Sequence, residues 1–194
     1  MSRKLSHLSP DEIIRMLKAA KEHSTRTWAM ALLSFRHGLR ASEVCALKLT
    51  DVDLKNCTIH ITRKKGSLET TQALCGHVGQ PLLDELKALR QYVRERPDDG
   101  SGYLFVSQKG GALTPVQWYK VFRAVAIGAG IDANRAHPHS LKHSLGYAPV
   151  KANVNPMVIK QSLGHRAMSS TAVYCGVTDN DASTAIKTSL MSIF

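Results

Sequence analysis

The chain has 194 residues, of which 43% are hydrophobic, enough to build the core of one domain. Its 26 Lys and Arg against 15 Asp and Glu give a net charge of +11, which favours a polyanionic partner such as nucleic acid. The sequence predicts no signal segment, and no apolar run approaches the ~18 residues of a membrane-spanning helix.

The cysteines narrow the chemistry further. Their spacing contains no CxxC pair, so it indicates neither a zinc knuckle nor a redox dithiol. We therefore expect reduced thiols in a cytoplasmic protein. The four residues are Cys45, Cys57, Cys75 and Cys175.

The chain begins with two predicted helices and a corner. The segment SPDE (9–12) is a capping box with proline in the first turn, and it predicts a helix that starts there. A second helix is predicted over Thr25–His37, and Gly38 ends it. A short helix over Ala41–Leu47 would then place Arg40 between two helices, where both hold its side chain.

A small hairpin is predicted next. Thr58–Thr62 alternates polar with apolar residues and is rich in β-branched side chains, which indicates a strand. Arg63–Ser67 is typical of a turn, and Glu69–Leu74 is a plausible return strand. Lys64 and Lys65 would therefore lie at the tip of this hairpin.

The second half of the chain is mainly helical. Apolar residues spaced three and four apart predict a helix over Pro81–Arg94, and Tyr103–Val106 predicts a short buried extended run. The fold class predicted is mainly α with a small antiparallel β-sheet, that is, α+β. Further helices are expected over Thr114–Ala126, from Pro138 to a break at Asn153–Pro156, from there to Gly164, from Met168 through Tyr174, and over Asp181–Phe194.

Five groups of this chain suit phosphoryl transfer if they meet. His139 and Lys142 lie one helical turn apart, His165 follows Gly164, Tyr174 comes nine residues later, and Arg40 lies far upstream. Ester exchange on a phosphodiester without a metal needs a nucleophile, cations for the phosphate oxygens and an acid for the leaving alkoxide. A phenol, with a pKa near ~10, needs nearby cations or a base to act as the nucleophile.

Each of these residues also has a simpler interpretation. A single tyrosine in a late helix is most often a core or surface residue. Arg40 after a glycine is ordinarily a solvated corner charge, and His139 near a helix start commonly caps backbone. Lysines at a hairpin tip are typical of a solvated turn or of protection against edge-to-edge pairing. The prediction of a site therefore depends on the order of all the pieces together.

That order resembles the catalytic domain of the tyrosine recombinases, the phage integrase family. The resemblance covers about Leu8 to Ala185, and the small size and the HPHSLKHS segment look most like the short invertases of fimbrial phase variation. The matching motifs are GLRASE (38–43), KG (65–66), HPHSLKHS (137–144), LGH (163–165) and Tyr174.

The resemblance implies site-specific DNA cleavage and rejoining through a 3′-phosphotyrosyl intermediate, with neither metal, ATP nor another cofactor. Tyr174 would be the nucleophile, Lys65, or its neighbour Lys64, the general acid, and His139 a partner in proton transfer. Arg40, Lys142 and His165 would hold the phosphate. The family usually has arginine at the position of Lys142, so charge is retained there and the bidentate fork is lost.

The resemblance also implies partners and domain limits. We expect double-stranded DNA with paired recombination sites, a homotetramer on that DNA and DNA-bending accessory proteins. The catalytic domain would span 1–180, with 181–194 a tail that docks either on a neighbouring protomer or on its own domain, and the family's N-terminal core-binding domain would be absent. The residues expected to contact DNA are Arg63, Lys64, His143 and Arg166.

Three alternatives stay open from the sequence. The first is a DNA-binding regulator that keeps the fold without catalysis, and the second is a type IB topoisomerase, which uses similar groups. The third is a metal enzyme, because His137, His139 and His143 have loosely ligand-like spacing, although Pro138 and the lack of nearby carboxylates count against it.

Overall fold

The computed structural model describes the chain from His7 to Met191 with several gaps. The described residues are 7–63, 66–151, 154–175, 183–184, 186–189 and 191, with the backbone alone for Lys151. The hairpin lysines Lys64 and Lys65 lie outside them, as does much of the predicted tail 181–194.

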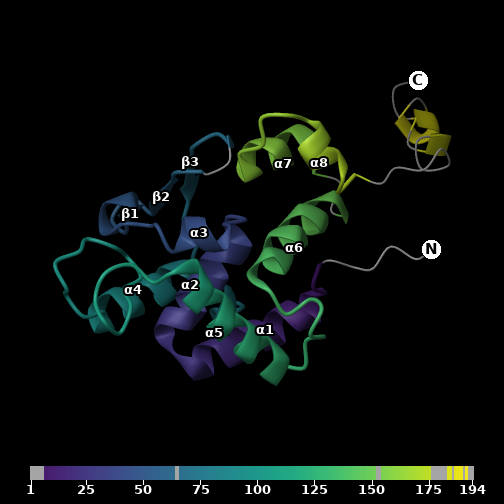
Figure 1. The fold of residues 1–194 in the computed structure, drawn as a ribbon. Helices are drawn as coiled ribbons and strands as arrows, with labels where there is room; N and C mark the ends of the chain where they lie inside the picture. The colour runs from purple at the N-terminus through teal and green to yellow at the C-terminus, as the bar shows by residue number, and fades with distance from the viewer. Residues whose placement is uncertain are drawn as a thin grey trace.

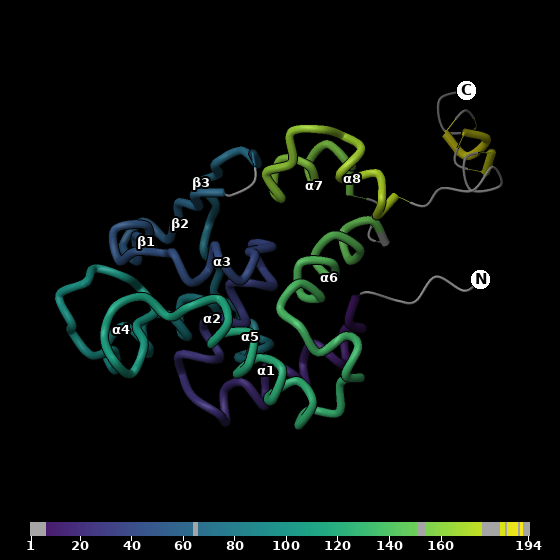
Figure 2. Tube along the Cα trace, in the orientation of Figure 1, coloured from purple at the N-terminus to yellow at the C-terminus, as the bar shows by residue number. Residues whose placement is uncertain are grey.

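Helices from both halves of the chain share one hydrophobic core (Figures 1 and 2). The first helix begins with the predicted capping box, in which Ser9 and Glu12 each bond the other's backbone N–H. The second helix is buried along most of its length, with Trp28 and Leu32 inaccessible to solvent. The longer helices are α1 (Pro10–His23), α2 (Thr25–Arg36), α4 (Glu85–Glu95), α5 (Pro115–Gly128), α6 (Pro138–Lys151) and α7 (Pro156–Leu163).

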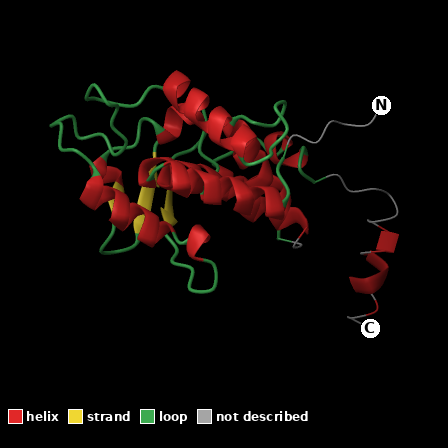
Figure 3. Cartoon of the chain, turned by 90° about the horizontal axis from the view of Figure 1, so that it is seen from below, coloured by secondary structure: helices red, strands yellow, loops and turns green. Residues whose placement is uncertain are grey.

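A small antiparallel sheet lies towards one end of the helical body (Figure 3). The predicted hairpin is confirmed as β2 (Thr58–Ile61) and β3 (Thr70–Ala73), with Ile59 opposite Gln72. A further short strand, β1 (Val52–Asp53), pairs with β2 and was not predicted. The predicted fold class, mainly α with a small antiparallel sheet, is confirmed.

Three predicted boundaries are wrong by a few residues. The helix expected from Pro81 starts at Glu85, because Asp84 caps it by accepting the Lys87 N–H at 2.8 Å. Residues Pro81–Leu83 instead form a 3₁₀ turn, η2. The helix expected to reach Leu47 is shorter, α3 (Ala41–Val44). The helix expected to carry Tyr174 is α8 (Ser169–Ala172), and Tyr174 follows it in a turn. The 3₁₀ turn η1 (Leu49–Asp51) is the other short element.

Packing of α7 brings the late part of the chain beside the early part. This helix contacts both α6 and β3, and α6 in turn packs on α2 (Figure 1). Strand β3 therefore lies beside α7, and the corner after α2 lies beside both α6 and the end of α7. None of the described helices has the length and apolar content needed to cross a bilayer.

Candidate active site

The corner between α2 and α3 holds Arg40. Gly38 ends α2 with φ of 59°, in the left-handed region where glycine is favoured. The backbone N–H of Arg40 donates to Glu43 Oε2 at 2.8 Å, and Arg40 Nη1 donates to Glu43 Oε1 at 2.6 Å. About a quarter of the Arg40 side chain is exposed. A buried carboxylate therefore fixes the guanidinium while part of it faces solvent.

Helix α6 brings Lys142 to this corner. Lys142 Nζ donates to the carbonyl oxygen of Gly38 at 2.9 Å, and the residue is 2% exposed. Burial, together with the charges of Arg63 and Arg40, lowers the pKa of Lys142 to about 7. A Cβ added at Gly38 would lie 2.6 Å from Leu163 Cδ2, so glycine is also what lets α7 approach so closely. Lys142 is thus a buried cation that titrates near neutral pH.

His165 enters from the end of α7. Gly164 ends the helix with φ of 66°, and a Cβ there would lie 2.5 Å from the carbonyl oxygen of Leu68. His165 Nδ1 lies 3.0 Å from the hydroxyl of Thr171, and a ring that accepts from this hydroxyl carries its proton on Nε2. Burial and the charge of Lys142 lower the pKa of His165 to about 4. The ring is therefore neutral at pH 7 and has an N–H to offer a ligand.

His139 and His143 lie one turn apart on α6. Their rings meet edge to face with centroids 4.4 Å apart. Partial desolvation, with the charges of His143 and Lys142, lowers the pKa of His139 to about 4. Burial also lowers the pKa of His143. Neutral His139 can therefore accept a proton or a hydrogen bond at physiological pH.

Tyr174 is docked against α6 rather than turned outward. It is 5% exposed, and a Cβ added at Gly146 would lie 2.5 Å from its ring atoms Cε1 and Cζ. The rings of Tyr147, His143 and His165 surround it, at centroid distances of 5.2, 6.1 and 6.5 Å. Burial and the neighbouring Tyr147 raise the pKa of Tyr174. In this position the phenol is protonated and sheltered from solvent.

The charge of Arg40 acts on each of the other four groups. After burial, it is among the causes that lower the pKa of Lys142, His139 and His165. It also opposes the rise in the pKa of Tyr174. The corner, α6, the end of α7 and the turn after α8 therefore converge on one centre, although they are remote in the sequence.

Comparison with known proteins identifies the family. The family model described as "Phage integrase family" matches residues 6–181. The chain belongs to this family. It is 35% identical over 175 residues to the type 1 fimbriae regulatory protein FimB of Escherichia coli K12, covering 89% of this chain and 85% of FimB. The recombinase function and the resemblance to fimbrial invertases predicted from the sequence are thereby confirmed.

Solved structures agree with this integrase-family assignment. The crystal structure of XerA recombinase superposes with a TM-score of 0.77 at 27% identity, over 94% of this chain and 64% of XerA. A pre-cleavage complex of the XerH site-specific recombinase with its difH substrate has the same fold, with a TM-score of 0.75 at 22% identity, over 96% of this chain and 55% of XerH. This integrase-family chain is a tyrosine-type site-specific recombinase.

Arg63, expected to contact DNA, instead packs beneath the integrase site, against Glu43 and the Gly38 corner. Its side chain is fully buried. Its Nη1 donates to the carbonyl oxygen of Gly38 at 3.2 Å and lies 3.4 Å from Glu43 Oε2. Both Nη1 and Nη2 of this buried guanidinium donate to protein oxygens, which places Arg63 beneath the site rather than at its surface. Glu43 thereby holds both Arg40 and Arg63, a role that was not predicted although Glu43 belongs to the GLRASE motif. Thr171 was also missed, and no sequence signal marks it.

Two further predicted DNA contacts, Arg166 and His143, lie beside the site. Arg166 is exposed beside His165, and His143 is half-buried among aromatic rings rather than at the open surface. Lys64 and Lys65 lie outside the described residues. Within the described part of the chain, no three His, Cys, Asp or Glu side chains are grouped so that they could hold a metal ion.

Proposed function

We propose that this recombinase breaks and reseals duplex DNA with Tyr174 as its nucleophile. The phenol oxygen forms a bond to the scissile phosphorus, and the bond from phosphorus to the 5′-oxygen breaks. The product is a 3′-phosphotyrosyl enzyme and a free 5′-hydroxyl. Attack by a 5′-hydroxyl reverses the step, so the energy of the broken ester is conserved and no nucleotide hydrolysis is needed.

The observation that carries this proposal is the convergence of cations and neutral imidazoles around Tyr174. Arg40 and Lys142 hold the non-bridging oxygens, where negative charge grows in the transition state. His165 donates from Nε2 to one of these oxygens, with Thr171 fixing its tautomer. A phosphate in this space supplies the counter-charge that keeps Lys142 protonated.

Two proton transfers complete the reaction. The phenol of Tyr174 loses its proton as it attacks, and neutral His139 accepts it. The departing 5′-oxygen gains a proton, which we assign to Lys65 on the hairpin loop, with Lys64 as its rival. Dispersed negative charge on the bound phosphate raises the pKa of His139 above its low value in the DNA-free protein, which favours the first transfer.

The partner that fits this chemistry is double-stranded DNA carrying paired recombination sites. The net charge of +11 favours a polyanion, and binding through phosphate contacts falls steeply with salt. Exposed Arg166, the half-buried His143 and Lys64, which lies outside the described residues, are the DNA contacts that we retain from the sequence. Exchange between two sites requires four cleavages, so we propose a homotetramer on DNA, aided by DNA-bending accessory proteins.

Covalent capture tests the proposal and finds the target site in the same experiment. A pool of nicked duplexes with randomised sequence around the nick is incubated with the protein, and denaturant-resistant adducts are recovered and sequenced. The nick lies a few nucleotides 3′ to the scissile phosphate, so the short fragment that carries the new 5′-hydroxyl diffuses away and the adduct cannot reseal. We expect the wild type to enrich one family of duplexes and Tyr174→Phe, which lacks only the hydroxyl, to recover none.

The same experiment separates the recombinase from a regulator that has lost catalysis. Tight binding to selected duplexes, with no adduct from the wild type under any condition, would overturn the nucleophile assignment. An adduct that persists in Tyr174→Phe would move the nucleophile to another residue.

A further inference from the structure

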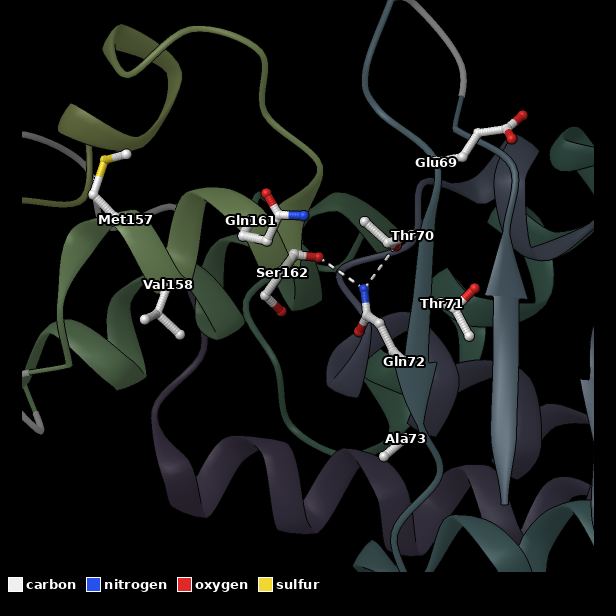
Figure 4. Close-up of a pocket in the computed structure, with 9 residues that line it drawn as sticks. All are labelled: Glu69, Thr70, Thr71, Gln72, Ala73, Met157, Val158, Gln161 and Ser162. Atoms are coloured by element: carbon white, nitrogen blue, oxygen red, sulfur yellow. Dashed lines mark hydrogen bonds between the residues drawn. The ribbon is translucent and has the colours of Figure 1, made fainter. Parts of the chain in front are cut away.

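A side-chain amide bridges the hairpin and the end of α7. A groove of about 630 Å³ runs between β3 and α7, and Gln72 reaches from the strand towards the helix (Figure 4). Its Nε2 donates to the carbonyl oxygen of Ser162 at 2.8 Å and to Thr70 Oγ1 at 3.0 Å. Its Oε1 lies 2.9 Å from His37 Nδ1. Gln72 therefore joins β3 to the last turn of α7 and to His37, which caps the C-terminus of α2.

The other arm of the hairpin makes the same connection. Arg63, which follows β2, donates from Nη2 to the carbonyl oxygen of His37 at 2.9 Å and to that of Ser162 at 3.1 Å. The carbonyl groups at a helix end lack partners within the helix, so these side chains satisfy Ser162 where α7 stops. Each arm of the hairpin thus holds His37 and Ser162 with one side chain.

The imidazole of His37 also lies against Glu85 of α4. Its Nε2 lies 2.7 Å from Glu85 Oε1, and both residues are almost completely buried. Glu85 in turn accepts the backbone N–H of Cys75 at 3.0 Å, just beyond β3. The imidazole therefore lies between Glu85 of α4 and Gln72 of β3.

The two residues held by the hairpin, His37 and Ser162, each precede a group of the active site. His37 is followed directly by the Gly38 turn and Arg40, and Ser162 lies three residues before His165. Movement of His37 or Ser162 would be passed on to the active site over a short link, because only two residues separate His37 from Arg40 and only two separate Ser162 from His165. The contacts of Gln72 and Arg63 with His37 and Ser162 therefore set the spacing between Arg40 and His165.

We propose that Gln72 is a positioning residue for the strand-cleavage step: its amide sets the separation of Arg40 and His165 so that both reach one phosphate. This inference rests on the phosphate-binding roles proposed above for those two residues. Gln72 offers two N–H donors and an acceptor from one planar group, a combination that neither a carboxylate nor a hydroxyl reproduces.

A double-mutant cycle with His165 tests this role. Adduct formation is timed on the suicide duplex recovered by covalent capture, for wild type, Gln72→Ala, His165→Ala and the double variant. A displacement of about 1 Å can cost on the order of 10²-fold in rate, so we expect Gln72→Ala to slow cleavage by about 10-fold to 10²-fold. In the His165→Ala background we expect Gln72→Ala to cost less than about 2-fold, because the group that it positions is gone.

Two further variants separate positioning from general loosening. Gln72→Glu keeps the side-chain volume and removes the donors to Ser162, so it should be slow as well. Gln91→Ala makes the same truncation at an exposed glutamine of α4, whose amide bonds the side chains of Thr25 and Glu95, both remote from the site, and it should react at the wild-type rate.

The outcomes are distinct. Equal losses for Gln72→Ala in both backgrounds, or a wild-type rate for Gln72→Glu, would overturn the positioning role while leaving the recombinase proposal intact. A wild type that forms no adduct would refute the proposed function and this inference together. DNA affinity measured in parallel should change less than about 2-fold in Gln72→Ala, because Gln72 itself holds no phosphate.

Discussion

Replacing Gly146 with alanine should release Tyr174 from its docked position on α6. The added Cβ would lie 2.5 Å from the Tyr174 ring, whereas ordinary contact begins at 3.4 Å, so the ring must move by about 0.9 Å. The backbone is no obstacle, because Gly146 lies inside a helix and lacks a positive φ. The substitution therefore acts on the tyrosine rather than on α6.

Two effects on stability oppose each other. Alanine favours a helix interior over glycine by about 1 kcal/mol. Freeing a buried aromatic ring costs roughly 1.5–3 kcal/mol. We therefore expect Gly146→Ala to lower the free energy of unfolding by roughly 0.5–2 kcal/mol. Gly128→Ala is the matched control: Gly128 is the last residue of α5, nothing lies within 4 Å of an added Cβ, and only the helix preference changes.

The direct assay is the pKa of the Tyr174 phenol, followed by NMR of ring-labelled tyrosine, with the Tyr174→Phe spectrum identifying the resonance. Burial is the main cause that raises this pKa, so release should return it towards the ordinary value. Because Tyr174 is 5% exposed where it docks on α6, we expect the ring to undock before attack, and adduct formation should be as fast as in wild type or faster.

Either of two results would refute this reasoning. If Gly146→Ala leaves the pKa of Tyr174 raised and gains stability as Gly128→Ala does, the ring does not dock on Gly146. If instead the pKa falls but cleavage is lost while DNA binding persists, the docked position is the reactive one, and undocking is not a step of the reaction.

The remaining predictions concern Lys142 and Thr171. Lys142→Arg should cleave at least as fast as wild type. At subsaturating DNA, where the DNA-free enzyme sets the pH profile, its rate advantage should grow as pH rises through about 7, since lysine loses charge there and arginine does not; an advantage independent of pH would contradict this. The folded-state pKa of Lys142 lies below its usual 10.5, so the unfolded chain binds more protons between about pH 7 and 10.5, and stability should rise with pH across that window. Lys142→Met should lack this slope in denaturant titrations. Thr171→Val keeps the shape but removes the partner of His165 Nδ1, and adduct formation should slow by about 10-fold with unchanged DNA affinity.

Local signals predicted the elements of this fold, and long-range contacts decided the details that were missed. The capping box at 9–12 and the β-branched alternation of Thr58–Thr62 act within a few residues, so both predictions were confirmed. The start of α4 was misplaced because apolar spacing continued through Pro81, whereas the Asp84 cap set the boundary. Burial of Arg63 was beyond sequence reasoning, because its carbonyl partners come from two distant segments, the corner at His37 and Gly38 and the end of α7.

The electrostatics of the site explain why its groups suit a phosphate. Burial lowers the pKa of Lys142, His139 and His165, so each resists holding a charge in the DNA-free protein. The carboxylate of Glu43 is shared between Arg40 and Arg63, which leaves little counter-charge for Lys142. A phosphodiester that enters this space supplies the missing negative charge, and protonation of Lys142 then becomes favourable. Binding of DNA near neutral pH should therefore take up protons, by an amount that shrinks in Lys142→Arg, because arginine is charged before the phosphate arrives.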